Sequence, residues 1–329
     1  MLLKGLATAL SPFSETAQLY ADCFALPAAT VILENENSID HEGVIPFHKI
    51  KDNNCHSTFV GSLFEDSLNA LIQKATIENF ETDISKVEGL MASKDKSDFH
   101  KFKNLDQFVE KTRPNLIDPI DMANLVSNLN HERSPVDEND LNLDLEKLQI
   151  YSWQNRLYWT NRGGSHHFAA AQYIAKKMDV PVKVTGRLEI KYFDSNAVTN
   201  FNKTFDAFMV PTDHYHEINS MDPDVCKGLV PAKAYNKFTD SISKVAIPFA
   251  TAELKDDDFR NIYVPENGAK ISVVHIIAFS KLHTNPLLLK QLHLRFKSFN
   301  SELLHQLNLQ RDNKVLTAAL KATGTKIKL

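Results

Sequence analysis

The stretch YWTNRGGSHHFAAAQYIAKKMDVPVKV (residues 158–184) constrains the fold of this chain most strongly. An aromatic, strand-like run ends at Thr160 and meets Gly163 and Gly164, which can adopt positive φ and form a tight turn. A helical pattern then continues to about Asp179, and the run VPVKV that follows predicts a second strand. A strand, a glycine turn, a helix and a second strand within so short a segment predict a helix packed on a sheet.

The rest of the chain mixes helical and strand patterns. Residues 62–112 have helical spacing, and DMANLVSNLN predicts a short helix opened by Asp121. LQIYSW and RLYWT predict two strands joined by a turn at Gln154-Asn155. Strand-like runs in the second half are VPVKVTGRLEIKYF, FDAFMV, SKVAIPFA and ISVVHIIAF, and NPLLL predicts a later helix start.

These patterns predict an α+β fold with a mixed β-sheet and packed helices. Apolar residues make up 43% of the chain and charged residues 24%, the balance of a globular protein. We expect an N-terminal mixed α/β region (1–115), a core (116–195) and a C-terminal α+β region with a basic terminal helix (196–329).

The helix start after the glycines has the features of an anion site. Ser165 is a good N-cap, and the first helical turn would present free N–H groups at the positive end of the helix dipole. Arg162, Ser165, His166 and His167 add side-chain donors, which favour phosphate. The alternative is an ordinary glycine turn with a serine cap and surface histidines.

The segment GGSHHFAAAQYIAKKMDVPVKV resembles the signature of the ParB/sulfiredoxin superfamily, over residues 157–192. Members have a strand, then a glycine turn with histidine or arginine opening an Ala-Ala helix, then a loop into a Val-Pro-Val strand. In these relatives the turn and helix start hold the phosphates of CTP, ATP or ADP. The resemblance implies a ParB/sulfiredoxin-like core, elaborated at both ends, that binds ATP or CTP, with Mg²⁺ as a further cofactor.

Carried over to this sequence, the resemblance implies two sets of residues. The nucleotide-binding set is Arg162, Gly163, Gly164, Ser165 and His166, and the catalytic candidates are His166 and His167. Ser165 stands in place of the sulfiredoxin cysteine, so reduction of sulfinic acid through a thiol is not expected. His167 stands where the relatives have arginine, which removes a bidentate phosphate clamp.

A second, weaker constellation lies in VPTDHYHEINSMDPDVC. His214 and His216 alternate as on one face of a strand, and Glu217 could complete a metal site. The alternative, a polar loop with exposed histidines and carboxylates, is favoured by composition.

Charge and cysteine usage restrict the functional class. The net charge of −4 argues against a generally basic surface, although Lys281–Leu329 has nine Lys or Arg and two acids. This segment could bind nucleic acid or an acidic protein partner; a solvated amphipathic helix is the alternative. Three separated cysteines and the lack of a long apolar run predict a cytoplasmic protein without a membrane segment.

Two hypotheses follow for function. The first is a nucleotide-dependent enzyme, such as a phosphohydrolase, a kinase or a nuclease, in which His166 or His167 takes part in catalysis. The second is a non-catalytic binding module that a nucleotide switches and that engages DNA or a protein through its basic C-terminal segment. A structural protein that kept the fold and lost the site is a third reading, supported by the missing arginine.

Overall fold

A computed structural model describes residues 2–26, 32–33, 39, 47, 50–54, 58–90, 102–131, 136–137, 139–161, 163–213, 230–245, 249–255, 262–263, 273–283 and 285–327. The chain divides into two compact units, each built from separated segments. The first comprises Met1–Glu34, Ile45–Ile72 and Asp194–Leu307, and the second comprises Asn35–Val44, Gln73–Phe193 and Asn308–Leu329. The sequence predicts three consecutive regions, whereas contacts between segments that are distant in sequence define these two units.

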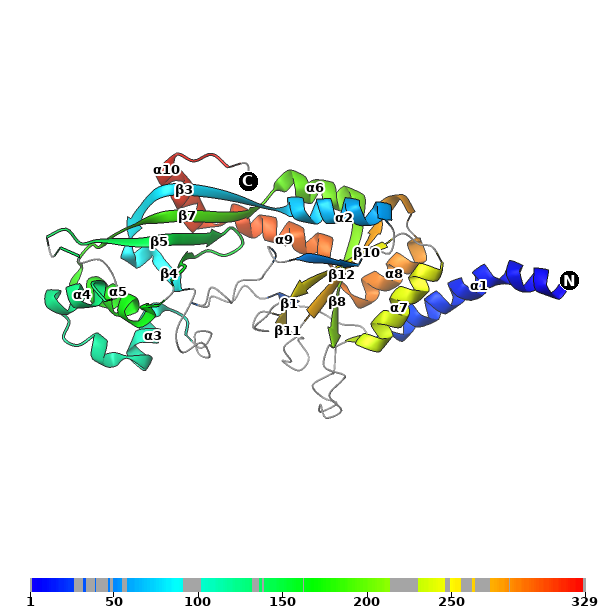
Figure 1. Cartoon of the computed structure of the whole chain (residues 1–329), viewed down its shortest axis with the longest axis horizontal. Helices are drawn as coiled ribbons and strands as arrows, with labels where there is room; N and C mark the ends of the chain where they lie inside the picture. The colour runs from blue at the N-terminus through cyan, green and yellow to red at the C-terminus, as the bar shows by residue number, and fades with distance from the viewer. Residues whose placement is uncertain are drawn as a thin grey trace. The chain divides into compact units, whose positions relative to one another are not determined.

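The second unit is built on a five-stranded sheet with the order β3-β7-β5-β6-β4 (Figure 1). β5 pairs in parallel with β7 and antiparallel with β6, and β4 pairs in parallel with β6, so the sheet is mixed. The expected α+β class with a mixed sheet is confirmed. The strand bounds are β3 (Ile72–Asp83), β4 (Val87–Leu90), β5 (Asn142–Tyr151), β6 (Leu157–Trp159) and β7 (Lys183–Phe193).

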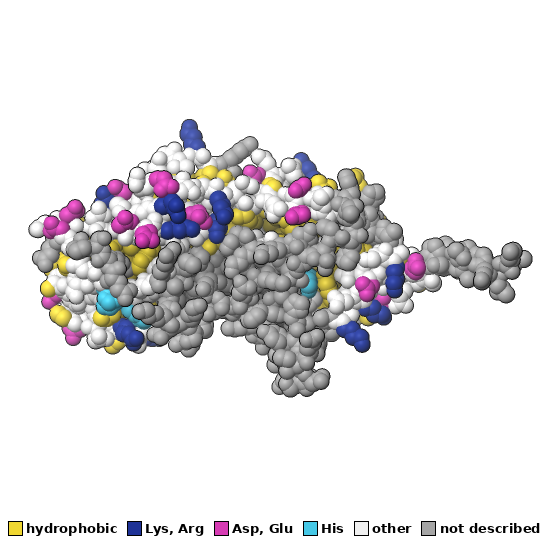
Figure 2. Space-filling view, in the orientation of Figure 1, with side chains coloured by type: hydrophobic (Ala, Val, Ile, Leu, Met, Phe, Trp, Pro, Cys, Tyr) yellow, Lys and Arg dark blue, Asp and Glu magenta, His cyan; other side chains and the backbone are white. Residues whose placement is uncertain are grey.

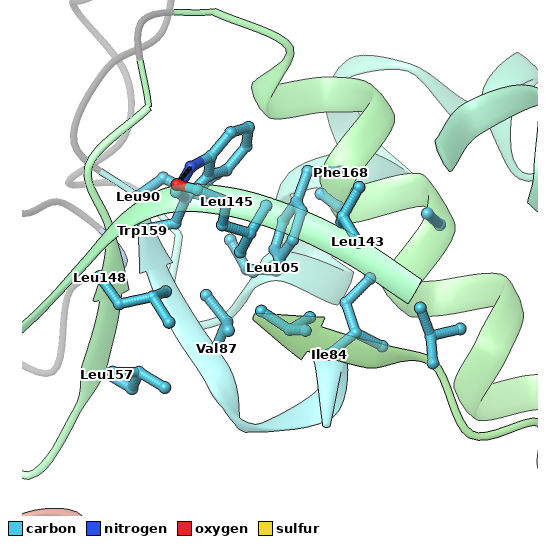
Figure 3. Packing of buried hydrophobic residues seen from close by; sticks show 14 of the residues in the cluster. Ile84, Val87, Leu90, Leu105, Leu143, Leu145, Leu148, Leu157, Trp159 and Phe168 are labelled. Carbon is cyan, nitrogen blue, oxygen red and sulfur yellow. Dashed lines mark hydrogen bonds between the residues drawn. The ribbon is translucent and has the colours of Figure 1, made fainter. Parts of the chain in front are cut away.

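Helices of the second unit pack on this sheet through a single hydrophobic core. They are α3 (Leu105–Thr112), α4 (Met122–Leu129), α5 (Ser165–Met178) and α10 (Lys314–Thr323), with short 3₁₀ turns at Ile84–Lys86 and Pro114–Leu116. Figure 3 shows Trp159 of β6 beside Phe168 of α5, with ring centroids 4.9 Å apart. The Trp159 indole Nε1 donates to the Leu145 carbonyl at 3.1 Å, which fixes β6 against β5 at the strand end that leads to α5.

Helix α5 follows the predicted pattern. Its buried face includes Phe168, Ala171, Ile174 and Ala175, at helical spacing. The helix ends at Asp179, which adopts the left-handed conformation with φ of 56° and whose N–H bonds back to the last turn. The alanines allow α3 and α4 to approach α5 closely, and both contact it.

The first unit contains a second sheet of mainly antiparallel strands with the order β13-β8-β12-β10-β2, and β9 pairs in parallel with β8. Aromatic and aliphatic side chains from this sheet pack against helices α1, α7 and α8. The strands are β2 (Lys51–Asn54), β8 (Phe205–Asp213), β9 (Val230–Pro231), β10 (Phe249–Lys255), β12 (Val273–Ser280) and β13 (Lys297–Ser298), and β1 (Ile32–Leu33) pairs with β11 (Ile262–Tyr263).

The helices of the first unit are distributed along its sequence. They are α1 (Leu2–Ala25), α2 (Thr58–Leu71), α6 (Ser195–Thr204), α7 (Ala232–Lys244), α8 (Pro286–Arg295) and α9 (Phe299–Arg311), with a 3₁₀ turn at Lys281–His283. The last residues of α9, from Asn308 on, belong to the second unit. No helix in the described part of the chain combines the length and apolarity that crossing a membrane requires.

Several local predictions are confirmed, and others are wrong. β5 and β6 form the predicted pair, Asp121 caps α4, and the strand-like run FDAFMV lies in β8. SKVAIPFA is not a single strand, because its first two residues end helix α7 and β10 begins at Phe249. Residues 62–112 are not continuously helical, because Ile72–Asp83 forms the edge strand β3. Pairing of this segment with β7 overrides its helical spacing.

Candidate functional site

The loop between β6 and α5 carries Gly163 and Gly164, and the first turn of α5 carries Ser165, His166 and His167. Gly164 has φ of 72° and is the N-cap of α5. Asn161 holds the loop, because its Nδ2 donates to the Gly163 carbonyl at 3.0 Å and to Ser165 Oγ at 2.8 Å. The prediction that Ser165 caps the helix is wrong: Ser165 is the first helical residue, is buried, and accepts a hydrogen bond from Asn161.

The start of α5 differs from five other helix starts in this protein. In α3, α4, α6, α8 and α10 an oxygen of the N-cap side chain accepts a hydrogen bond from a backbone N–H, the caps being Asn104, Asp121, Asp194, Asn285 and Asn313. In α5 the cap is Gly164, which has no side chain to do this. The N-cap of α5 therefore supplies no side-chain acceptor of the kind that these five caps supply.

The two histidines of the first turn are held by different neighbours. The His166 ring stacks on Phe108 of α3, with centroids 4.7 Å apart. The His167 ring stacks on His131, with centroids 3.5 Å apart, and its Nδ1 lies 2.9 Å from Asn128 Oδ1. Both histidines are half-buried, and Figure 2 shows histidine side chains at the surface beside α4 and α5.

The hydrogen bonds of Asn128 determine which nitrogen of His167 carries a proton. Asn128 Nδ2 donates to the carbonyls of Leu116 and Asn124, each at 3.0 Å. The amide nitrogen is thereby oriented away from His167, and Oδ1 can only accept. His167 Nδ1 must therefore be the donor, and in the neutral ring Nε2 is the basic nitrogen. This arrangement suits a residue that exchanges a proton through Nε2.

The remaining sequence-predicted residues lie outside the part of the chain that the structure describes. Arg162 lies outside the described residues, and so do the weaker metal candidates His214, His216 and Glu217. Among the residues that are described, no group of three or more His, Cys, Asp or Glu side chains has the geometry of a metal site.

Sequence reasoning missed the residues that support the loop and the histidines. Asn128 and His131 belong to the α4 region, Phe108 belongs to α3, and Asn161 precedes the glycines. Only Asn161 had a local signal, because asparagine before a glycine turn is a typical turn residue. The other contacts depend on how α3 and α4 pack on α5.

The basic segment Lys281–Leu329 does not form one basic helix. It is divided among a 3₁₀ turn, α8, β13, α9 and α10. Two of its lysines are paired: Lys281 Nζ lies 3.3 Å from Asp206, and Lys297 Nζ lies 2.7 Å from Glu302. Figure 2 also shows acidic and basic side chains interspersed over β3, β5 and β7 rather than a field of one sign.

Comparisons with known proteins place the chain in a family without assigning an activity. The model of DUF6685, a family of unknown function, matches residues 77–283, and the chain belongs to this family. No curated protein matches the chain. No solved structure matches it either.

Proposed function

We propose that this protein binds a phosphate group of a nucleotide, ATP or CTP with Mg²⁺, at the start of α5. The observation that carries the proposal is the glycine cap: Gly164, at φ of 72°, caps α5 without a side chain, so that a ligand can approach the backbone closely. The positive end of the helix dipole at an N-terminus favours an anion. The local resemblance to the ParB/sulfiredoxin superfamily supports a nucleotide as the source of that anion.

In this proposal the backbone around Gly163 and Gly164 approaches the phosphate, and Arg162 and His166 contribute side-chain donors. Ser165 contributes its backbone N–H, because its side chain is buried against Asn161. The proposed location is the cytoplasm, which the sparse cysteine usage favours.

We further propose that His167 transfers a proton in a phosphohydrolase, kinase or nuclease reaction. The support is the contact between Asn128 Oδ1 and His167 Nδ1, which would leave Nε2 as the exchanging nitrogen. The alternative, a nucleotide-switched module that engages DNA or an acidic protein through Lys281–Leu329, has less support. Its basic residues are spread over several elements and are partly paired.

Calorimetric titration with ATP, CTP, GTP and ADP, with and without Mg²⁺, tests the proposal. His167→Glu is the most informative variant, because an acid in the first turn suits the helix dipole but repels phosphate. Lys177→Glu is the matched control, since it places the same side chain in the last turn of the same helix. We expect the native protein and the control to bind a nucleotide and His167→Glu to lose binding by about tenfold or more.

The outcomes separate binding from catalysis. Absence of binding by the native protein to all four nucleotides would contradict the proposed function. If a nucleotide binds, His167→Gln should retain binding and lose hydrolysis or transfer. Turnover that is unchanged in His167→Gln would exclude His167 as the proton-transfer residue while leaving nucleotide binding intact.

A further inference from the structure

The second unit contains a cavity of about 400 Å³ that shares no residue with the start of α5. It lies between α10 and the strands β3, β4, β5 and β6. Because β3 and β4 are the two edge strands of the sheet, residues from both edges line the cavity. The lining residues are Phe80, Glu81, Thr82, Lys86, Glu88, Ile150, Leu157, Lys314, Val315, Ala318, Ala319 and Ala322. A volume of this size is within the range of small-molecule sites.

Small side chains on one stripe of α10 leave this space open. The lining positions of α10 include 315, 318, 319 and 322, which have the spacing of a single helical face. Three of these four are alanine, so α10 has no large side chain to fill the space next to Phe80 and Ile150. Leu316, one position away, is fully buried in the core and holds the helix on the sheet.

The rim of the cavity carries an excess of positive charge. Glu81 is neutralised by Lys183, whose Nζ lies 2.8 Å from its carboxylate. Lys86 and Lys314 also lie at the rim, and within the described residues neither forms an ion pair. These two lysines are opposed only by Glu88 among the lining residues. An apolar floor below two available ammonium groups suits a ligand with an apolar body and one anionic end.

We infer that this cavity binds a small amphipathic molecule with an apolar chain or ring system and a single anionic headgroup, of the class of a medium-chain carboxylate. The apolar part lies on Phe80, Ile150 and Leu157, and the headgroup lies between Lys86 and Lys314. This site is independent of the proposed nucleotide site.

Calorimetric titration of the full chain with decanoate and with decanol tests the inference. The two probes share a chain and differ in the headgroup. Ala318→Trp and Ala322→Trp fill the cavity from positions that are exposed to solvent, so the fold should tolerate them. Lys321→Trp is the matched control, because Lys321 is exposed on the same helix and does not line the cavity.

We expect decanoate to bind the native protein and Lys321→Trp equally well. It should bind Ala318→Trp and Ala322→Trp more weakly, by a factor of about ten at least. Decanol should bind the native protein more weakly than decanoate. In the double variant Lys86→Glu/Lys314→Glu the preference for decanoate should disappear, whereas Lys321→Glu should retain it. Inorganic phosphate should not compete with decanoate, because it lacks an apolar part.

Three results would overturn the inference. The first is no binding of decanoate to the native protein. The second is equal weakening in Ala318→Trp, Ala322→Trp and Lys321→Trp, which would place the probe elsewhere. The third is decanol binding as tightly as decanoate, which would show that the cavity does not recognise an anionic headgroup.

Discussion

Among the described residues, most buried polar side chains of the second unit are amides, whereas the first unit buries two carboxylates. The amides of the second unit are Asn128, Gln149, Gln154, Asn161, Gln172, Gln310 and Asn313. The carboxylates of the first unit are Asp22 and Glu302, which are 4% and 1% exposed. An amide donates and accepts without titrating, whereas a buried carboxylate needs a cation or several donors. The two units should therefore respond differently to mutation and to pH.

The largest effect is expected for Asn313→Ala in the second unit. Asn313 Oδ1 accepts from the Leu316 N–H as the N-cap of α10, and its Nδ2 donates to the carbonyls of Ser152 at 2.9 Å and Gln154 at 2.7 Å. Loss of the cap and of two buried carbonyl partners should lower the free energy of unfolding by about 3 kcal/mol.

Urea denaturation followed by tryptophan fluorescence measures this loss, because both tryptophans, Trp153 and Trp159, lie in the second unit. Asn104→Ala is the matched control. Asn104 caps α3 at an exposed position and bonds one N–H, so its loss should cost only about 1 kcal/mol. Equal losses in the two variants would show that the amide of Asn313 contributes nothing beyond the cap.

The first unit should lose stability in acid through its buried carboxylate Asp22. Burial by itself raises the pKa of Asp22, but hydrogen bonds from Lys237, Ser241 and Gln18 outweigh it and lower the pKa below its ordinary value of 3.8. A carboxyl with a lowered pKa stabilises the folded state above its ordinary pKa. This stabilisation is lost as the pH falls through the lowered value.

Hydrogen exchange of α1 and α7 peptides at neutral pH and near pH 3.5 measures this loss, because Asp22 connects these helices through Lys237 and Ser241. Asp22→Asn should weaken protection at neutral pH by about 1.5 kcal/mol and remove most of the acid dependence. Acid dependence of α1 and α7 that is unchanged in Asp22→Asn would assign it to another group.

A smaller effect is expected for Gly164→Ala. A side chain at φ of 72° is strained, and we expect a loss of about 1 kcal/mol from the backbone alone. Gly324→Ala is the matched comparison, because Gly324 has φ of 66° and nothing within 4 Å of an added Cβ. Urea denaturation of both variants separates backbone strain from crowding at the proposed phosphate site; a larger loss at Gly164 would indicate crowding.

The smallest effect is expected for an exposed ion pair of the second unit, Glu81–Lys183. Glu81 and Lys183 have side chains that are 58% and 47% exposed, although their charged atoms lie 2.8 Å apart. Glu81→Gln should change the free energy of unfolding by about 0.5 kcal/mol or less, and less still in high salt. A loss as large as that of Asn313→Ala would contradict the view that amides rather than ion pairs hold this unit.

Local signals in the sequence predicted the elements around the candidate site. Asp121 predicted the start of α4, and the Ala-rich run predicted α5. The turn at Gln154-Asn155 predicted the pairing of β5 with β6. Each of these depends on capping, helical spacing or turn chemistry, which are properties of a few neighbouring residues.

Long-range contacts could not be predicted in the same way. The helical spacing of Ile72–Asp83 was misleading, because a place at the edge of the sheet makes it a strand. The contact of His167 with Asn128 joins residues from two helices, and the cavity joins α10 to strands far away in sequence. Such contacts follow from packing, which no local pattern encodes.

The discontinuous second unit has a consequence for synthesis of the chain on the ribosome. Its strands lie within Gln73–Phe193, but Gln310 and Asn313, which bond to Phe193 and Ser152, are translated only after Asp194–Leu307. At ordinary elongation rates this delay is on the order of ten seconds. Throughout this interval the nascent sheet lacks α10 and exposes apolar surface around Ile150 and Leu157. Chaperones can bind this surface, and other unfolded chains can aggregate through it.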